Sequence, residues 1–387
     1  MEIKKEELEE IFNNVSNQLA PKNIFLDDKK KKEFESAIRN IGKNVPLKFI
    51  EHFLVDIMQL AQISPVENYR ITDNLEIDQI LENISVGMND NKKITFSING
   101  QSHLGYLKSN LIPVFNDASI AMYELGNLLG VNIAPTYSTI YNGKPYIISQ
   151  SINENGEDFL MMQEFTNKYK SDADFSKPID SREKIKRLIM TPLDSLKKYQ
   201  EQTPGITDEA VQQFIDSYVD MLCFDYVTNQ TDRNFDNFGV LIGNNGAISF
   251  APLIDSDFIL NKPSDGNENR GFSMKKDYDK DVAMSVLYEL FPERVQSFRS
   301  RLYFNENEIQ SILNTHFSED MLFGQGNYHN IFAQNVQQFY ELIPNISISQ
   351  ASRMAIEDVT QEDIKQADMA EELLKSPIKE QGERDGD

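Results

Sequence analysis

The chain has 387 residues, with 61 acidic and 38 basic side chains and a formal net charge of −23. This acidic balance argues against a nucleic-acid-binding module, whose surface is usually basic, and against docking on an anionic membrane. The single cysteine, Cys223, excludes an intrachain disulfide and a cysteine-based zinc site. At roughly 150 residues per domain, the length predicts two or three units.

Two features of the sequence bear on its location. The first ten residues are mostly charged and cannot form the apolar segment of a signal peptide. No stretch approaches the ~18 apolar residues of a membrane-spanning helix. We therefore expect a cytoplasmic protein that binds neither membrane nor nucleic acid directly.

Residues 1–88 are expected to form a helical appendage. Apolar side chains recur there at spacings of three and four, in three stripes that include Leu8, Phe34 and Ile50. Two roles fit such a unit. It either packs as an extension of the main fold or presents a surface to a regulatory partner.

Residues 89–165 show the alternation of apolar and polar side chains that is typical of strands. Alternating runs flank Asn99-Gly100 and again Asn142-Gly143, and both indicate hairpins because Asn-Gly favours the tight turns between antiparallel strands. Between the hairpins, the apolar spacing over 117–129 indicates a helix. This part is therefore expected to be a small antiparallel sheet with one helix.

Residues 166–345 are expected to be mostly helical. The clearest helix begins at Thr207 or the residue after it, where an oxygen-bearing cap is available, and a polar loop follows the helix. Two short strands, 238–242 and 247–250, form a hairpin among the helices. Residues 346–387 are acidic and polar and are expected to be partly disordered. The predicted fold class is α+β.

Three oxygen-bearing side chains lie around this second hairpin. Asp232 and Asn237 are on the polar loop before it, and Asp255 follows its second strand. Because the ends of a hairpin meet, we expect Asn237 and Asp255 to lie close together. Phosphoryl transfer needs a carboxylate beside the attacking hydroxyl and oxygen ligands for Mg²⁺, while Lys108, at the end of an earlier strand, supplies a cation for the phosphates. The alternative is two polar turns whose side chains cap the backbone.

The order of these features resembles the HipA-like kinases, which are bacterial serine/threonine protein kinases with a two-lobed kinase-like fold. The run Asn229-Gln230-Thr231-Asp232-Arg233, followed by Asn237-Phe238-Gly239, is similar to their catalytic loop. Pro252-Leu253-Ile254-Asp255 resembles their metal-binding segment, and residues 129–135 resemble the link that follows their small-lobe helix. The resemblance covers residues 90–345.

The resemblance implies ATP and Mg²⁺ as cofactors and a protein hydroxyl as phosphate acceptor. It also implies a small antiparallel-sheet lobe over 89–165 and a mostly helical lobe over 166–345. Arg233 is expected to be structural and to pair with a buried carboxylate or carbonyl. That role for Arg233 comes from its residue type and not from the resemblance. The resemblance itself assigns these roles: Asp232 as catalytic base, Asn237 and Asp255 as Mg²⁺ ligands, Lys108 as the phosphate-binding lysine, and Gln150 and Ile152 at the hinge that meets adenine.

The sequence departs from the family in three places. Kinases carry a Glu on the small-lobe helix that pairs with the lysine, and the matching position here is Ser119. Asp117 and Glu124 lie on one edge of that helix, and we favour Glu124 as the partner because its side chain reaches further. Asn234 replaces the usual His, and no clear Gly-rich loop precedes Lys108. Two other functions therefore stay open: a pseudokinase acting as an ATP-responsive binding module, and a small-molecule or lipid kinase.

Overall fold

The computed structural model describes most of the chain between residues 4 and 343. The described ranges are 4–22, 24–28, 71–86, 89–109, 113–153, 156–170, 181–230, 235–254, 279–317, 322–323 and 326–343, together with residues 31, 32, 34, 35, 38, 50, 51, 54, 55, 58, 233 and 256. The expected tail over 346–387 lies outside them. The predicted division into four parts stays a prediction.

Helix α1, Lys5–Leu19, is the first element, and a short 3-10 turn, Ala20–Lys22, follows it. The helix buries one face, as the first apolar stripe predicted. The structure describes only single residues of the two later stripes. The buried residues of α1 are Leu8, Ile11, Phe12, Val15 and Leu19.

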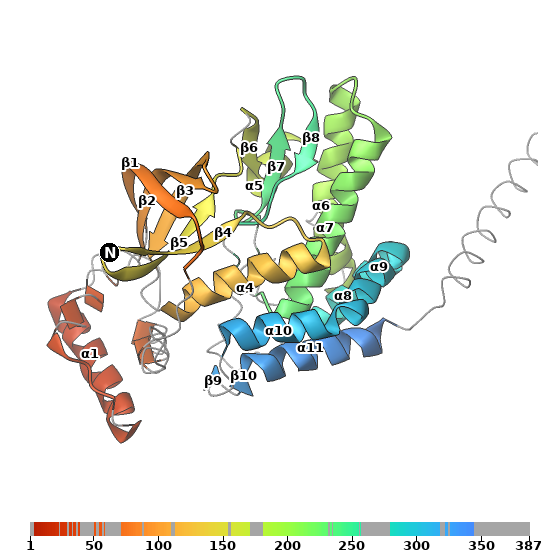
Figure 1. Cartoon of the computed structure of the whole chain (residues 1–387). Coiled ribbons are helices and arrows are strands. Elements are labelled where there is room, and N and C mark those ends of the chain that lie inside the picture. The colour runs from red at the N-terminus through yellow and green to blue at the C-terminus, as the bar shows by residue number, and fades with distance from the viewer. Residues whose placement is uncertain are drawn as a thin grey trace, which may run out of the picture. The chain divides into compact units, whose positions relative to one another are not determined.

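The small lobe is an antiparallel sheet in the order β1-β2-β3-β5-β4 (Figure 1). Helix α4, Pro113–Leu129, connects β3 to β4. Both predicted hairpins are confirmed, because Asn99 and Asn142 each have a φ of 51° and a glycine with positive φ follows each. The strands are β1 Leu75–Val86, β2 Asn89–Ile98, β3 Gln101–Ser109, β4 Thr136–Tyr141 and β5 Lys144–Gln150.

Strand β1 corrects the expectation that helices extend to residue 88. Apolar side chains at Ile77, Ile80, Leu81 and Ile84 have the spacing of a helix. In the structure, this segment pairs with β2 along its length, with irregularities in the register after Ile77 and after Ile80. Each irregularity moves the alternation of side chains by one position, which hides the period of two. The prediction of helix for residues 75–86 is therefore wrong.

The second lobe is mostly helical, as predicted. A three-stranded antiparallel sheet, β6-β7-β8, accompanies the helices and consists of Asp158–Met161, Gly239–Ile242 and Ile248–Phe250. The short strands β9, Leu322–Phe323, and β10, Gly326–Asn327, pair with each other. The helices are α5 Met162–Lys168, α6 Ser181–Gln202, α7 Asp208–Thr228, α8 Lys280–Leu290, α9 Pro292–Phe304, α10 Glu306–His316 and α11 Tyr328–Leu342. The α+β class is confirmed, with an antiparallel sheet in one lobe and mostly helices in the other. The kinase-like nature of this two-lobed fold stays a prediction.

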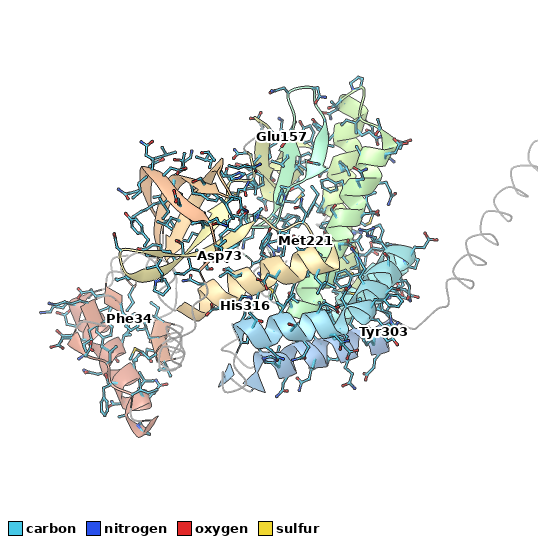
Figure 2. All side chains as sticks on the ribbon, in the orientation of Figure 1. Phe34, Asp73, Glu157, Met221, Tyr303 and His316 are labelled. Atoms are coloured by element: carbon cyan, nitrogen blue, oxygen red, sulfur yellow. The ribbon has the colours of Figure 1, made fainter. Side chains whose placement is uncertain are left out.

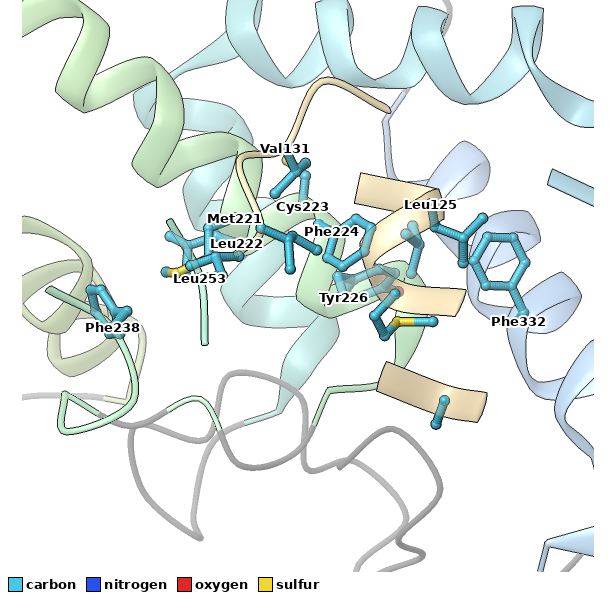
Figure 3. Packing of buried hydrophobic residues seen from close by; sticks show 14 of the residues in the cluster. Leu125, Val131, Met221, Leu222, Cys223, Phe224, Tyr226, Phe238, Leu253 and Phe332 are labelled. Atoms are coloured by element: carbon cyan, nitrogen blue, oxygen red, sulfur yellow. The ribbon is translucent and has the colours of Figure 1, made fainter. Parts of the chain in front are cut away.

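Helix α7 runs through the core of the helical lobe. The Thr207 side chain caps its start by accepting a hydrogen bond from the Ala210 amide (3.2 Å), as predicted. Every residue from Tyr218 to Thr228 is buried. Figure 3 shows side chains of this stretch in one hydrophobic cluster with Val131 and Leu253. The end of α7 is therefore held from several sides, which gives the loop after it a fixed starting point.

Within the described ranges, no helix combines the length and the apolar character needed to span a membrane.

Candidate active site

The structure describes five of the predicted site residues and the neighbours of the other two. Asp232 and Asp255 themselves lie outside the described residues. Arg233 follows the first of them in the chain, and Ile254 and Ser256 stand on either side of the second. These neighbours locate the two segments that carry the predicted carboxylates.

The side chain of Arg233 contacts the end of α7, the loop before β7 and the segment after β8. This side chain is 2% exposed and donates to the Asp225 carboxylate through Nε (3.1 Å) and Nη2 (3.4 Å). Nη2 also donates to Ser256 Oγ (3.1 Å), and Nη1 donates to the carbonyls of Asn237 (3.1 Å) and Ile254 (2.9 Å). These bonds match the five N–H donors of a guanidinium. Arg233 thus pairs with a buried carboxylate and with carbonyls, as predicted.

The second hairpin brings its two ends together, as the sequence predicted. Strands β7 and β8 pair antiparallel, and the Ala251 amide donates to the Gly239 carbonyl (3.0 Å). Outside the hairpin, Nη1 of Arg233 donates to the carbonyls of both Asn237 and Ile254, which lie on the two sides of the hairpin in the chain. The two predicted metal-binding segments therefore meet at one guanidinium.

The loop before the hairpin is anchored where α7 ends. Asn229 ends the helix in the left-handed conformation, with a φ of 61°. The last carbonyls of a helix have no partner within the helix, and here side chains of α11 supply partners. Tyr328 donates to the Thr228 carbonyl (2.8 Å), and Asn335 donates to that of Val227 (3.4 Å).

The link from α4 to β4 contacts the predicted metal-binding segment directly. The Ala134 amide donates to the Leu253 carbonyl (2.9 Å), and the Leu253 amide donates to the Asn132 carbonyl (2.8 Å). Ile133 and Leu253 form an isolated parallel bridge. The small lobe is therefore bonded through its backbone to a residue two positions before Asp255.

Lys108 lies on β3, an inner strand of the small-lobe sheet. In the register of the sheet it stands between Asn91 of β2 and Ile147 of β5. The side chain is half-buried. A lysine on a strand that is paired on both sides has a well-defined backbone position, which suits a residue that must meet a phosphate. Its phosphate-binding role stays a prediction.

Glu124, the predicted partner of Lys108, contacts the helical lobe. Its Oε2 lies 3.0 Å from Nε2 of His316, the last residue of α10. Figure 2 labels His316 at the end of α10 that lies beside α4. Burial raises the pKa of Asp117, the alternative acid, to about 6, while the charge of His316 acts in the opposite direction. Both acids thus have His316 as a neighbour, and pairing of Glu124 with Lys108 stays a prediction.

Replacing Asp117 by Asn should make the protein more stable at pH 7.5 and leave its stability unchanged near pH 4. The folded-state pKa of Asp117, about 6, lies above the usual value near 3.9. The stability from this group is therefore present below pH ~4 and is lost as the pH rises through 6. A difference of two pKa units corresponds to ~1–3 kcal/mol for a partly exposed group. Denaturant unfolding of both proteins at both pH values measures it, and an equal difference at the two values would contradict it.

Gln150 and Ile152 lie where the chain leaves the small lobe. The Gln150 amide donates to the Pro135 carbonyl (2.8 Å). The Gln150 side chain accepts from the Tyr137 hydroxyl (3.3 Å) and lies 3.1 Å from His103 Nδ1. Ile152 is half-buried in the turn after β5. The Gln150 side chain therefore braces the sheet, and contact of this segment with adenine stays a prediction.

Asp225, Ser256 and His316 also belong to this region and were not predicted from the sequence. Asp225 carried a signal, since it is an acid within the apolar end of α7 and needs a buried partner. Ser256 and His316 carried none, because their contacts depend on the tertiary structure. No group of three or more His, Cys, Asp or Glu side chains suited to a metal occurs among the residues that the structure describes.

Comparisons with known proteins find similarity in structure alone. No family model matches the chain, and no curated protein matches it. The Helicobacter pylori proinflammatory kinase CtkA is 14% identical, with 74% of this chain and 96% of that chain covered and a TM-score of 0.41. A chain in the complex of Shewanella oneidensis HipA, HipB and operator DNA is 11% identical (87% and 85% covered, TM-score 0.38). The Drosophila melanogaster PAN3 pseudokinase is 12% identical (79% and 72% covered, TM-score 0.22).

Proposed function

We propose that this chain is an ATP- and Mg²⁺-dependent phosphotransferase that transfers the γ-phosphoryl group of ATP to a protein hydroxyl. One observation carries the proposal. The buried guanidinium of Arg233 bonds the loop that contains Asn237 and both residues that flank Asp255. The three predicted oxygen-bearing groups thus belong to segments that meet at one side chain. Carboxylate and amide oxygens are the donors that Mg²⁺ prefers.

Each residue has a distinct role in the proposed reaction. Asp232 accepts the proton of the attacking hydroxyl, which makes the oxygen a better nucleophile. Asn237 and Asp255 hold Mg²⁺, which supplies positive charge against the phosphates. Lys108 binds the phosphates from the small-lobe sheet. The backbone bonds between Leu253 and the link after α4 keep this lysine's lobe attached to the metal-binding segment.

A pseudokinase that binds ATP and signals through a conformational change is the second candidate. The observation in its favour is the contact of Glu124 with His316, because His316 then competes with Lys108 for this carboxylate. Ser119, which stands at the position that matches the kinase Glu, points the same way. The two functions differ in one measurable outcome, which is transfer of phosphate.

ATP with Mg²⁺ should raise the melting temperature of the wild-type protein, and Asp255→Ala should abolish the Mg²⁺-dependent part of the rise. The physical reason is that a ligand that binds only the native state stabilises it, by ~2.7 kcal/mol at 100 times its Kd. Thermal unfolding with ATP, with Mg²⁺ and with both measures the effect. An unchanged melting curve at saturating ATP and Mg²⁺ would contradict nucleotide binding.

Phosphate transfer separates the two candidates. Labelled ATP and Mg²⁺ are incubated with the protein alone and with a cell lysate, and protein-bound label is counted. A kinase labels itself or a lysate protein, and Asp232→Asn removes that label. Binding of ATP without any transfer would support the pseudokinase.

A further inference from the structure

The acceptors of Arg233 come from three segments that are separate in the chain. Asp225 lies on α7, Asn237 lies on the loop before β7, and Ile254 and Ser256 lie after β8. A residue that only stabilised its own loop would need acceptors from that loop alone. Arg233 instead bridges the two predicted metal-binding segments and ties both to the buried end of α7.

The ion pair behind this bridge is fully removed from water. The side chains of Arg233 and Asp225 are each 2% exposed. Burial raises the pKa of the Asp225 carboxyl, and the charge and hydrogen bonds of Arg233 lower it. Desolvation of two charges offsets much of their attraction, so a buried pair is weak evidence of stabilisation. The ion pair lies between the two segments that carry the predicted metal ligands, so its main effect is expected to be on the distance between those segments.

A second ion-pair cluster on the same helix, with a buried acid and half-buried arginines, offers a comparison. Asp220 is 1% exposed and accepts from Arg294 and Arg301 of α9. This cluster joins two helices and, among the residues that the structure describes, bonds none of the loop before β7 or of the segment after β8. A change at Arg294 therefore disturbs an ion pair on α7 without touching the predicted metal ligands.

We propose that Arg233 is a positioning residue that holds the segments of Asn237 and Asp255 at the separation that one Mg²⁺ requires, with Asp225 fixing the guanidinium. This inference rests on the proposed function. Because its five donors already have acceptors within the protein, Arg233 has none left for a phosphate of ATP or of a phosphorylated loop. It acts through the ligands, and not on the substrate.

The test compares Arg233→Lys with Arg294→Lys. Lysine keeps the charge but replaces the planar, five-donor group by a compact ammonium, which cannot reach acceptors on three segments. Loss of such outer partners typically costs ~10–100-fold in metal affinity. We expect the Mg²⁺ concentration for half-maximal ATP stabilisation to rise about 10-fold or more in Arg233→Lys. In Arg294→Lys this Mg²⁺ concentration should stay within about twofold of the wild-type value, although both variants lose thermal stability. High Mg²⁺ should restore much of the Arg233→Lys response.

Amide hydrogen exchange provides a readout that is independent of nucleotide. Peptides covering 235–242 and 251–254 should exchange faster in Arg233→Lys than in the wild type, and at the wild-type rate in Arg294→Lys. Ser256→Ala removes one of the five bonds and should show a smaller change of the same kind, which covers the case that Arg233→Lys fails to fold.

Two results would overturn the inference. One is an unchanged Mg²⁺ requirement in both Arg233→Lys and Ser256→Ala. The other is an equal shift in Arg294→Lys, which would reflect general loss of stability. If the wild-type protein itself gives no Mg²⁺-dependent response, the proposed function fails, and the exchange rates still decide whether Arg233 positions the two segments.

Discussion

Asp232→Asn should leave ATP binding near the wild-type value and remove almost all phosphate transfer. A general base acts in the chemical step, whereas Asn237 and Asp255 act on the metal and the bound phosphates. Loss of a general base typically costs ~10²–10⁴-fold in rate. The substitution is nearly isosteric, so the fold should persist. The rate of label transfer from ATP, and the ATP-induced rise in melting temperature, are measured on the same preparation.

Asp255→Asn is the matched control for this result. It removes a proposed metal ligand, so it should weaken binding and transfer together, with partial recovery at raised Mg²⁺. Full transfer by Asp232→Asn would make Asp232 a turn residue and place the base elsewhere. Damage to binding by Asp232→Asn equal to that by Asp255→Asn would instead make Asp232 a metal ligand.

Short-range signals in the sequence were sufficient for much of the fold. The two Asn-Gly turns and the cap at Thr207 depend on the conformational preferences of a few adjacent residues, and the structure has all three. Strand β1 was predicted as helix because its register with β2 shifts after Ile77 and after Ile80. Such a shift depends on the partner strand, which is not encoded in the local pattern.

In the candidate site, too, the features set by adjacent residues could be predicted, whereas the contacts between distant residues could not. The loop that carries Asn237 could be located from the sequence, because a capped apolar helix precedes it and a short hairpin follows it. The partners of Arg233 and the contact of Glu124 with His316 could not, since Glu124 and His316 lie 192 residues apart. The favoured acid was chosen by its reach, a local property, while its contact is decided by how α10 packs on α4.

Gly239→Ala should destabilise the protein by ~3 kcal/mol or more, at the upper end of what overpacking costs. Gly239 pairs with Met161 across β6 and β7 and does not have a positive φ, so its backbone conformation suits alanine. The obstacle is space. A Cβ on Gly239 would overlap the carbonyl oxygen of Leu160 and lie 2.7 Å from Cε2 of Phe159. A backbone carbonyl within a paired strand cannot rotate away, so β6 and β7 must separate.

The control for this prediction is Gly243→Ala, at the other end of β7. There the nearest atom to a Cβ would be Oδ1 of Asn245 at 3.1 Å, which is the end of a side chain that can move. We expect a change within about 0.5 kcal/mol, as for an ordinary surface substitution. Urea unfolding gives both values from the transition midpoints, provided that the slope m is unchanged. Equal midpoints for the two variants would show that β6 yields to the methyl group, and the glycine of Asn237-Phe238-Gly239 would then not be required by the close approach of these strands.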